Sequence, residues 1–173
     1  GYMGRITKEK GMEYLLKACE CLKKDNIPFK FMLAGKEDIQ DEFIPRFAEI
    51  LSSDFIYAGV VSGNEKEEFI NKLDLFILPS FFEGLPMSLL ESMAQGVVPI
   101  TTNVGSISDV VEDKKNGIFI EVKDSISIYN AIYELARDRE KIADLSQEAY
   151  KTIKSKFSPR EYVLQLNNIY NKA

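Results

Sequence analysis

Short apolar runs alternate with longer amphipathic segments along this 173-residue chain. The apolar runs are continuous rather than alternating with polar residues, which is typical of strands covered on both faces. The predicted strands lie at 30–35, 54–60, 74–80, 97–102 and 117–122. Between them, a helical spacing of apolar residues predicts helices at 9–26, 41–53, 65–73 and 86–95 and a short helix at 106–113.

This alternation of strands and helices predicts βαβ units, and right-handed crossovers then give an α/β fold with a doubly wound, Rossmann-like parallel sheet. Before Gly4 only Tyr2 and Met3 remain of an expected first strand, which indicates a truncated start. At the other end, three extra helices follow without strands, at 125–137, 139–156 and 159–172.

Composition predicts one domain spanning residues 1–173, with 45% apolar and 28% charged residues. No apolar run approaches the roughly 20 residues that span a bilayer, and a net charge of −5 disfavours a general nucleic-acid binder. The chain has no histidine, the commonest general base and metal ligand. Cys19 and Cys21, two apart on a helix, point away from each other and are expected to be free, buried or half-buried thiols in a reducing compartment.

Candidate ligand contacts follow the predicted strands, because doubly wound sheets bind ligands beyond the carboxyl ends of their strands. Gly4, Gly35 and Gly59 each come directly after a strand, where glycine allows a ligand to approach the backbone, although βα turns favour glycine in any case. Arg5 and Lys10 flank a short loop where two cations could meet a diphosphate; the alternative is that both are solvated charges. Neither a Walker sequence nor a G-x-G-x-x-G opening a helix is present.

The segment FFEGLPMSLLESMAQG, residues 81–96, carries two acids around a predicted helix from Pro86 to Gln95. Glu83 lies in the loop before this helix and Glu91 lies within it, so the two carboxylates should be well separated. They suit two hydroxyl-bearing parts of one extended ligand, with a phosphate at the start of the helix between them. A sugar nucleotide has this layout; an ordinary helix with two solvated acids is the alternative.

Several motifs together resemble those of the C-terminal, donor-binding domain of family-4, or group 1, glycosyltransferases of the GT-B fold. Glu83 and Glu91 match the E-x7-E signature of that family, and the resemblance covers nearly the whole chain. The matching segments are GRITKEKG, LAGKED, FIYAGVV and DLFILPSFFEGLPMSLLESMAQGVVPITTNVGSISDVVEDKKNGIFIEV.

The resemblance implies a role for each matching residue. Arg5 and Lys10 match the basic pair that holds the donor diphosphate and carries the charge of the leaving group. Glu83 matches the acid that contacts the transferred sugar, and Glu91 the acid that takes the ribose hydroxyls. The remaining expected donor contacts lie in the phosphate-and-sugar loop, in the loop bordering the base, and after the second predicted strand: Gly84, Leu85, Pro86, Met87, Gly59, Val60 and Gly35.

The implied activity is that of a retaining, hexosyltransferase-type enzyme that uses a nucleoside-diphosphate sugar as co-substrate, with no metal and no other cofactor. Its acceptor would be a glycan or a lipid-linked glycan, in bacterial surface polysaccharide synthesis at the cytoplasmic face of the membrane. Catalysis in this architecture takes place between two domains, and the N-terminal acceptor-binding domain is absent from the chain. We therefore expect a donor-binding half that is inactive alone, whose last helix at 159–172 crosses back to the N-terminal domain.

Two departures from the family pattern concern the fit of the sugar: Ser106 replaces a frequent glycine, and Pro86 replaces the glycine of the commoner EGFG form. Two other functions stay open. The chain could be a non-catalytic nucleotide-binding or assembly module of the same fold. It could also be a receiver-type signalling domain with Asp74 as phosphoacceptor, although Asp74 begins its predicted strand rather than ending it.

Overall fold

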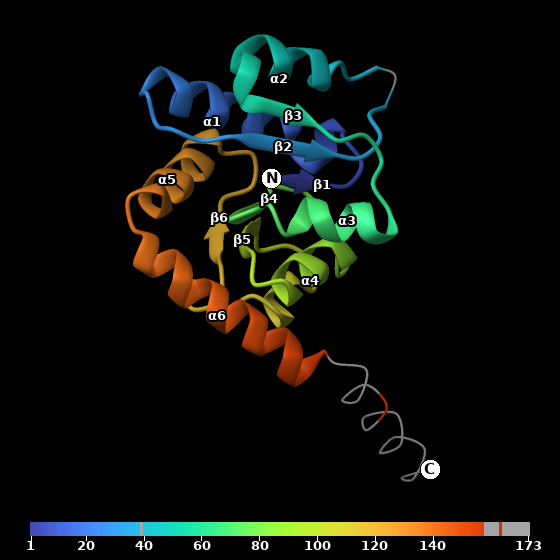
Figure 1. The fold of residues 1–173 in the computed structure, drawn as a ribbon, viewed down its shortest axis with the longest axis vertical. Coiled ribbons are helices and arrows are strands. Elements are labelled where there is room, and N and C mark those ends of the chain that lie inside the picture. Colours follow the sequence, from blue (N-terminus) through green and yellow to red (C-terminus); the bar gives the residue numbers. More distant parts are fainter. Residues whose placement is uncertain (39, 158–162, 164–173) are drawn as a thin grey trace.

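The computed structural model describes residues 1–38, 40–157 and 163. Its described strands form two parallel three-stranded sheets (Figure 1). The first sheet has the order β1-β2-β3, and the second has the order β4-β5-β6. Their bounds are β1 Tyr2–Met3, β2 Phe31–Ala34, β3 Phe55–Tyr57, β4 Leu75–Leu78, β5 Val98–Thr102 and β6 Ile118–Ile120.

Backbone hydrogen bonds through Gly1 join the two sheets between β1 and β4. The nitrogen of Gly1 donates to the Leu75 carbonyl at 2.7 Å, and the nitrogen of Ile77 donates to the Gly1 carbonyl at 2.8 Å. The strand order across the molecule is therefore β3-β2-β1-β4-β5-β6. From β1, the chain adds strands first on one side and then, starting with β4, on the other. This is the strand order of a doubly wound α/β fold, as the sequence predicted.

Helices cover both faces of the sheets, with α1 and α5 on one side and α3 and α4 on the other (Figure 1). Helix α1 contacts α2 and α5, and α6 contacts α4, α5 and β5. Aspartate side chains cap the starts of α5 and α6: Asp124 accepts from the Ile126 amide, and Asp138 accepts from the Lys141 amide. The bounds are α1 Met12–Lys24, α2 Phe43–Leu51, α3 Gly63–Ile70, α4 Met87–Ala94, α5 Ser125–Ala136 and α6 Arg139–Lys156, with 3₁₀ turns η1 Lys8–Lys10, η2 Ser52–Asp54 and η3 Ile107–Asp109.

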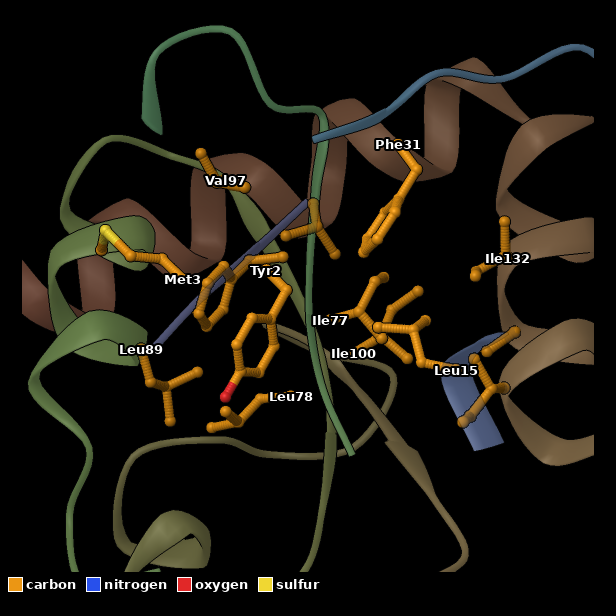
Figure 2. Packing of buried hydrophobic residues seen from close by; sticks show 14 of the residues in the cluster. Tyr2, Met3, Leu15, Phe31, Ile77, Leu78, Leu89, Val97, Ile100 and Ile132 are labelled. Carbon is orange, nitrogen blue, oxygen red and sulfur yellow. The ribbon is translucent and has the colours of Figure 1, made fainter. Parts of the chain in front are cut away.

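The hydrophobic core joins the strands to the helices on both faces, and Figure 2 shows part of it. All five residues of β5 are buried, as expected for a central strand. The expectation of coverage on both faces is wrong for β3, where Ile56 and Tyr57 are 40% and 41% exposed. β3 is the edge strand of its sheet. No further strand lies beside it, so its side chains are covered less than those of a central strand.

Three local predictions differ from the structure. The helix expected at 106–113 is only the turn η3, because Asn116 donates to the Val110 carbonyl and accepts from the Glu112 amide, which replaces helical hydrogen bonding there. Apolar spacing also predicts a buried side of α4 formed by Leu89, Leu90, Met93 and Ala94, but in the structure Leu90 and Ala94 are half-buried and Ser92 is buried.

The third concerns the thiols: Cys19 is buried, but Cys21 is exposed. The helix predicted at 159–172 lies outside the described residues apart from Val163. Among the described helices, none has the length and apolar character needed to cross a bilayer.

Replacement of Gly35 by alanine should destabilise the fold far more than the same change at Gly59. Both glycines have positive φ, +136° and +71°, but a Cβ on Gly35 would lie 1.7 Å from the Gly4 carbonyl oxygen, whereas one on Gly59 would meet nothing within 4 Å. We expect Gly35→Ala to cost about 3 kcal/mol or more of unfolding free energy and Gly59→Ala about 1 kcal/mol. Urea unfolding measures both; equal losses would show that β1 and β2 do not approach so closely.

The two cysteines should differ in reactivity. Burial raises the pKa of the Cys19 thiol to about 12, and the side chain is 2% exposed. Because the thiolate is the reactive form, Cys19 should be inert at pH 8 while exposed Cys21 reacts. A colorimetric thiol titration should find one reactive thiol in the native protein and two in guanidinium chloride, with Cys21→Ser removing the native signal. Reaction of both thiols in the folded protein would contradict this packing of α1.

Candidate functional site

The candidate site begins where the loops after β1 and β4 meet, at the point where the strand order reverses. The amide of Phe81 donates to the Glu9 carbonyl at 2.9 Å, which ties the two loops together. Gly11 permits this approach, since its φ is +76° and a Cβ there would lie 2.1 Å from the Pro79 carbonyl oxygen. Ligands of doubly wound folds bind in the crevice at this point.

Glu83 and Lys10 form an ion pair across these two loops. The Lys10 ammonium donates to Oε1 of Glu83 at 2.6 Å, and the side chains are 20% and 9% exposed. A carboxylate this shielded from water needs a partner, and Lys10 supplies it. The structure therefore brings together two residues that the sequence had assigned to different parts of a ligand, 73 positions apart.

Arg5 lies in the same loop and is exposed to solvent. It forms no ion pair with any residue in the described ranges. Tyr2 lies below it in the core, where its hydroxyl donates to the Arg5 carbonyl at 2.6 Å. Burial and, to a smaller extent, the charge of Glu83 raise the pKa of the Tyr2 phenol above its usual range, so Tyr2 stays protonated and keeps this hydrogen bond. Arg5 thus combines a backbone held by Tyr2 with a solvent-exposed guanidinium.

The loop that contains Glu83 is also fixed from the β5 side. The amide of Ser106 donates to the Gly84 carbonyl at 3.0 Å. Gly105 has φ of +58°, and a Cβ there would lie 1.9 Å from the Glu83 carbonyl oxygen, so only glycine fits. Ser106 has φ of −94°, which any residue can adopt. The serine in place of a glycine therefore needs no strained backbone.

Glu91 lies on α4, the helix that follows this loop. Pro86 is the N-cap of α4 and no side chain caps that end, so the first N–H groups and the positive end of the helix dipole are available to an anion. Glu91 is itself paired: the ammonium of Lys66, on α3, donates to its Oε1 at 2.7 Å. The exposed fractions of the two side chains are 31% and 33%.

The loops after β2 and β3 complete this edge. The Gly35 amide donates to the Gly59 carbonyl at 2.7 Å, and the Tyr57 hydroxyl donates to the Gly35 carbonyl at 2.8 Å. Val60 is 70% exposed; Leu85, in the loop before α4, is 37% exposed, and Met87, the first residue of α4, is 64% exposed. Gly35, Gly59 and Val60 thus lie beyond the carboxyl ends of β2 and β3, as predicted.

Sequence analysis did not predict the contacts of Lys66 and Tyr2 at the candidate site. Lys66 lies in the acidic run NEKEEF, which is typical of a solvated helix face, and nothing in that run indicates a partner 25 positions away. Tyr2 could be predicted as a buried strand residue, but the hydrogen bond of its hydroxyl depends on the path of the loop that follows.

A cavity of about 1000 Å³ lies at the opposite edge of the sheet, lined by residues at the amino ends of the strands such as Gly1, Phe31 and Leu75. It includes neither acid of the candidate site. Asp74 lies at this amino end and pairs with Arg139 at 3.3 Å, away from the edge where a phosphoacceptor would be needed. Within the described ranges, no three or more acidic or cysteine side chains cluster in a way that could hold a metal ion.

Solved structures of glycosyltransferases share this fold. HepE of Anabaena, in complex with UDP, matches the whole chain with a TM-score of 0.87 at 18% identity, and the match covers 48% of HepE. The C-terminal domain of a group 1 family protein, LpcC of Francisella tularensis, gives a TM-score of 0.79 at 22% identity, covering 91% of this chain and 85% of that domain. The doubly wound domain is therefore of the type found in GT-B glycosyltransferases.

The family model for glycosyl transferases group 1 matches residues 1–152, so the chain belongs to this family. Among similar proteins are an uncharacterized glycosyltransferase of Methanocaldococcus jannaschii, 27% identical over 99% of the chain, and a capsular polysaccharide biosynthesis glycosyltransferase of Staphylococcus aureus, 25% identical over 99%. The chain spans less than half the length of these relatives, 44% and 45% respectively.

Proposed function

We propose that this chain is the donor-binding half of a retaining glycosyltransferase that transfers a hexose from a nucleoside-diphosphate sugar without a metal ion. The observation that carries the proposal is the pair of lysine-bound acids, Glu83 and Glu91, on either side of the uncapped start of α4. This arrangement offers acceptors for hydroxyl groups at two places and positive potential between them.

Each group takes one part of the donor in this proposal. Glu83 accepts from hydroxyls of the sugar and Glu91 from those of the ribose, while Gly59 and Val60 border the base. Arg5 and Lys10, with the backbone amides around Gly84, Leu85 and Met87, hold the diphosphate; Pro86 has no amide hydrogen to give. Gly35 allows the close approach of the backbone. Lys10 needs little movement for this role, since it already lies beside the sugar-binding acid.

The chemistry expected of these residues is electrostatic. When the glycosidic bond to the diphosphate breaks, negative charge builds up on the leaving phosphate, and preorganised cations stabilise it. Arg5 is unpaired within the described residues and exposed, so its guanidinium can turn to the phosphate; Lys10 is held nearby. These two cations would fill the role that a divalent metal has in other glycosyltransferases.

The acceptor and its site belong to the longer protein in this proposal. Relatives of this chain are about twice its length or more, and one is named for capsular polysaccharide biosynthesis. We propose that an N-terminal domain binds a glycan or lipid-linked acceptor, that the reaction serves bacterial surface polysaccharide synthesis at the cytoplasmic face of the membrane, and that this half alone binds donor without turnover.

Nucleotide binding should appear as thermal stabilisation of this chain. With UDP, GDP, ADP and their glucose or mannose conjugates as probes, a ligand at 100 times its dissociation constant adds about 2.7 kcal/mol, or about 5–10 °C. We expect a shift with one base, lost in Glu91→Ala and kept in Glu148→Ala, a lysine-paired glutamate on α6.

Two other outcomes separate the alternatives. No shift with any probe, here or in the full-length protein, would contradict the proposal. Binding without turnover in the full-length protein would instead favour a non-catalytic nucleotide-binding module.

Removal of the Arg5 side chain should weaken the binding of the nucleoside diphosphate and leave the binding of the free nucleoside unchanged. A charge-assisted hydrogen bond contributes about 1.5–3 kcal/mol, so Arg5→Ala should lower the affinity for the bound nucleoside diphosphate by about tenfold to hundredfold. Calorimetric titration with the nucleoside and its diphosphate measures the difference. Equal losses for the two ligands would contradict the role of Arg5.

A further inference from the structure

We infer that Lys66 is a positioning residue for ribose recognition: it holds Oε1 of Glu91 so that Oε2 is presented to the ribose hydroxyls. The inference rests on the proposed function and adds a residue to its nucleotide site. Lys66 lies on α3 and Glu91 on α4, so the 2.7 Å ion pair links the helix after the base loop to the helix of the ribose acid.

Among the described residues, this ion pair is the one side-chain contact that restrains the carboxylate of Glu91. No other side chain in the described part of the chain donates a hydrogen bond to Glu91. The Lys66 ammonium donates a hydrogen bond to Oε1 of Glu91. A carboxylate has two oxygens that accept hydrogen bonds, so Oε2 remains available.

The exposure of the pair indicates what it contributes. Both side chains are about a third exposed, at 33% and 31%, and ion pairs this accessible to water add little to folding stability. They do restrict two flexible side chains. A glutamate that is already held in place loses less freedom when a ligand binds, which improves affinity without any new contact to the ligand.

The sugar end of the site repeats the arrangement. There, Lys10 holds Oε1 of Glu83 at 2.6 Å from a different loop. Each acid of the signature is therefore bound through one oxygen by a lysine from a neighbouring element. At Glu83 the lysine is also a diphosphate ligand in our proposal, whereas Lys66 acts through Glu91 alone.

The expected effect of Lys66→Met is a loss of affinity of about threefold to tenfold for whichever of UDP, GDP and ADP binds the wild-type chain. The loss should be smaller for the corresponding 2′-deoxynucleoside diphosphate, because that ligand lacks one of the hydroxyls that Glu91 accepts from. Discrimination between ribose and 2′-deoxyribose should therefore decrease. Lys66→Arg, which keeps a donor to Oε1, should restore most of it.

The decisive measurement is a double-mutant cycle by calorimetric titration, with Lys66→Met, Glu91→Gln and the double variant. Glu91→Gln should remove most of the discrimination, and Lys66→Met should then have no further effect. Lys151→Met, which breaks an exposed lysine–glutamate pair on α6, is the matched control and should bind like the wild type. Unfolding temperatures of all variants show that each is folded.

Three results would overturn the inference. Unchanged ribose discrimination in Lys66→Met would show that Glu91 needs no positioning. If Lys66→Met lowers the affinity for the nucleoside diphosphate as much in the Glu91→Gln background as in the wild type, Lys66 contacts the nucleotide directly. If the wild-type chain and the full-length protein bind none of the three diphosphates, the proposed function fails together with the inference. In the first two cases only the inference fails, and the proposed function stands.

Discussion

The reversal of strand order between β1 and β4 is the constraint on which the candidate site depends. Two backbone hydrogen bonds through Gly1 hold these strands side by side. The loops after them then emerge at the same edge, and contact between the Gly11 backbone and Pro79 brings them together. Residues far apart in the sequence thus become neighbours, and the Lys10–Glu83 pair follows from this junction.

Charge balance at this edge answers a difficulty in the sequence. A chain with a net charge of −5 that places two of its acids at the candidate site should repel a diphosphate. The structure pairs each acid with a lysine, so the site carries no excess of negative charge there, and Arg5 and the start of α4 add positive potential. The acids can then accept hydroxyl hydrogen bonds close to an anionic group.

The family pattern named candidate residues but not the contacts between them. Arg5, Lys10 and Glu83 lie in the segments that follow β1 and β4, and Glu91 lies within α4; their roles in ligand binding stay predictions from the resemblance. The resemblance assigns Lys10 to the diphosphate, and the structure adds an ion pair between Lys10 and Glu83. Ser106 replaces a frequent glycine of the family, and its φ of −94° shows that the serine adopts this backbone without strain.

The sequence alone determined most of the strand and helix pattern and the parallel doubly wound sheet, since these depend on local periodicity and on chain-order rules. The tertiary structure decided that β3 is an exposed edge strand and that Lys66 binds Glu91. It also decided that the Tyr2 hydroxyl supports the Arg5 loop. Each of these depends on distances between segments that are remote in the chain, and such distances are fixed only when the core packs.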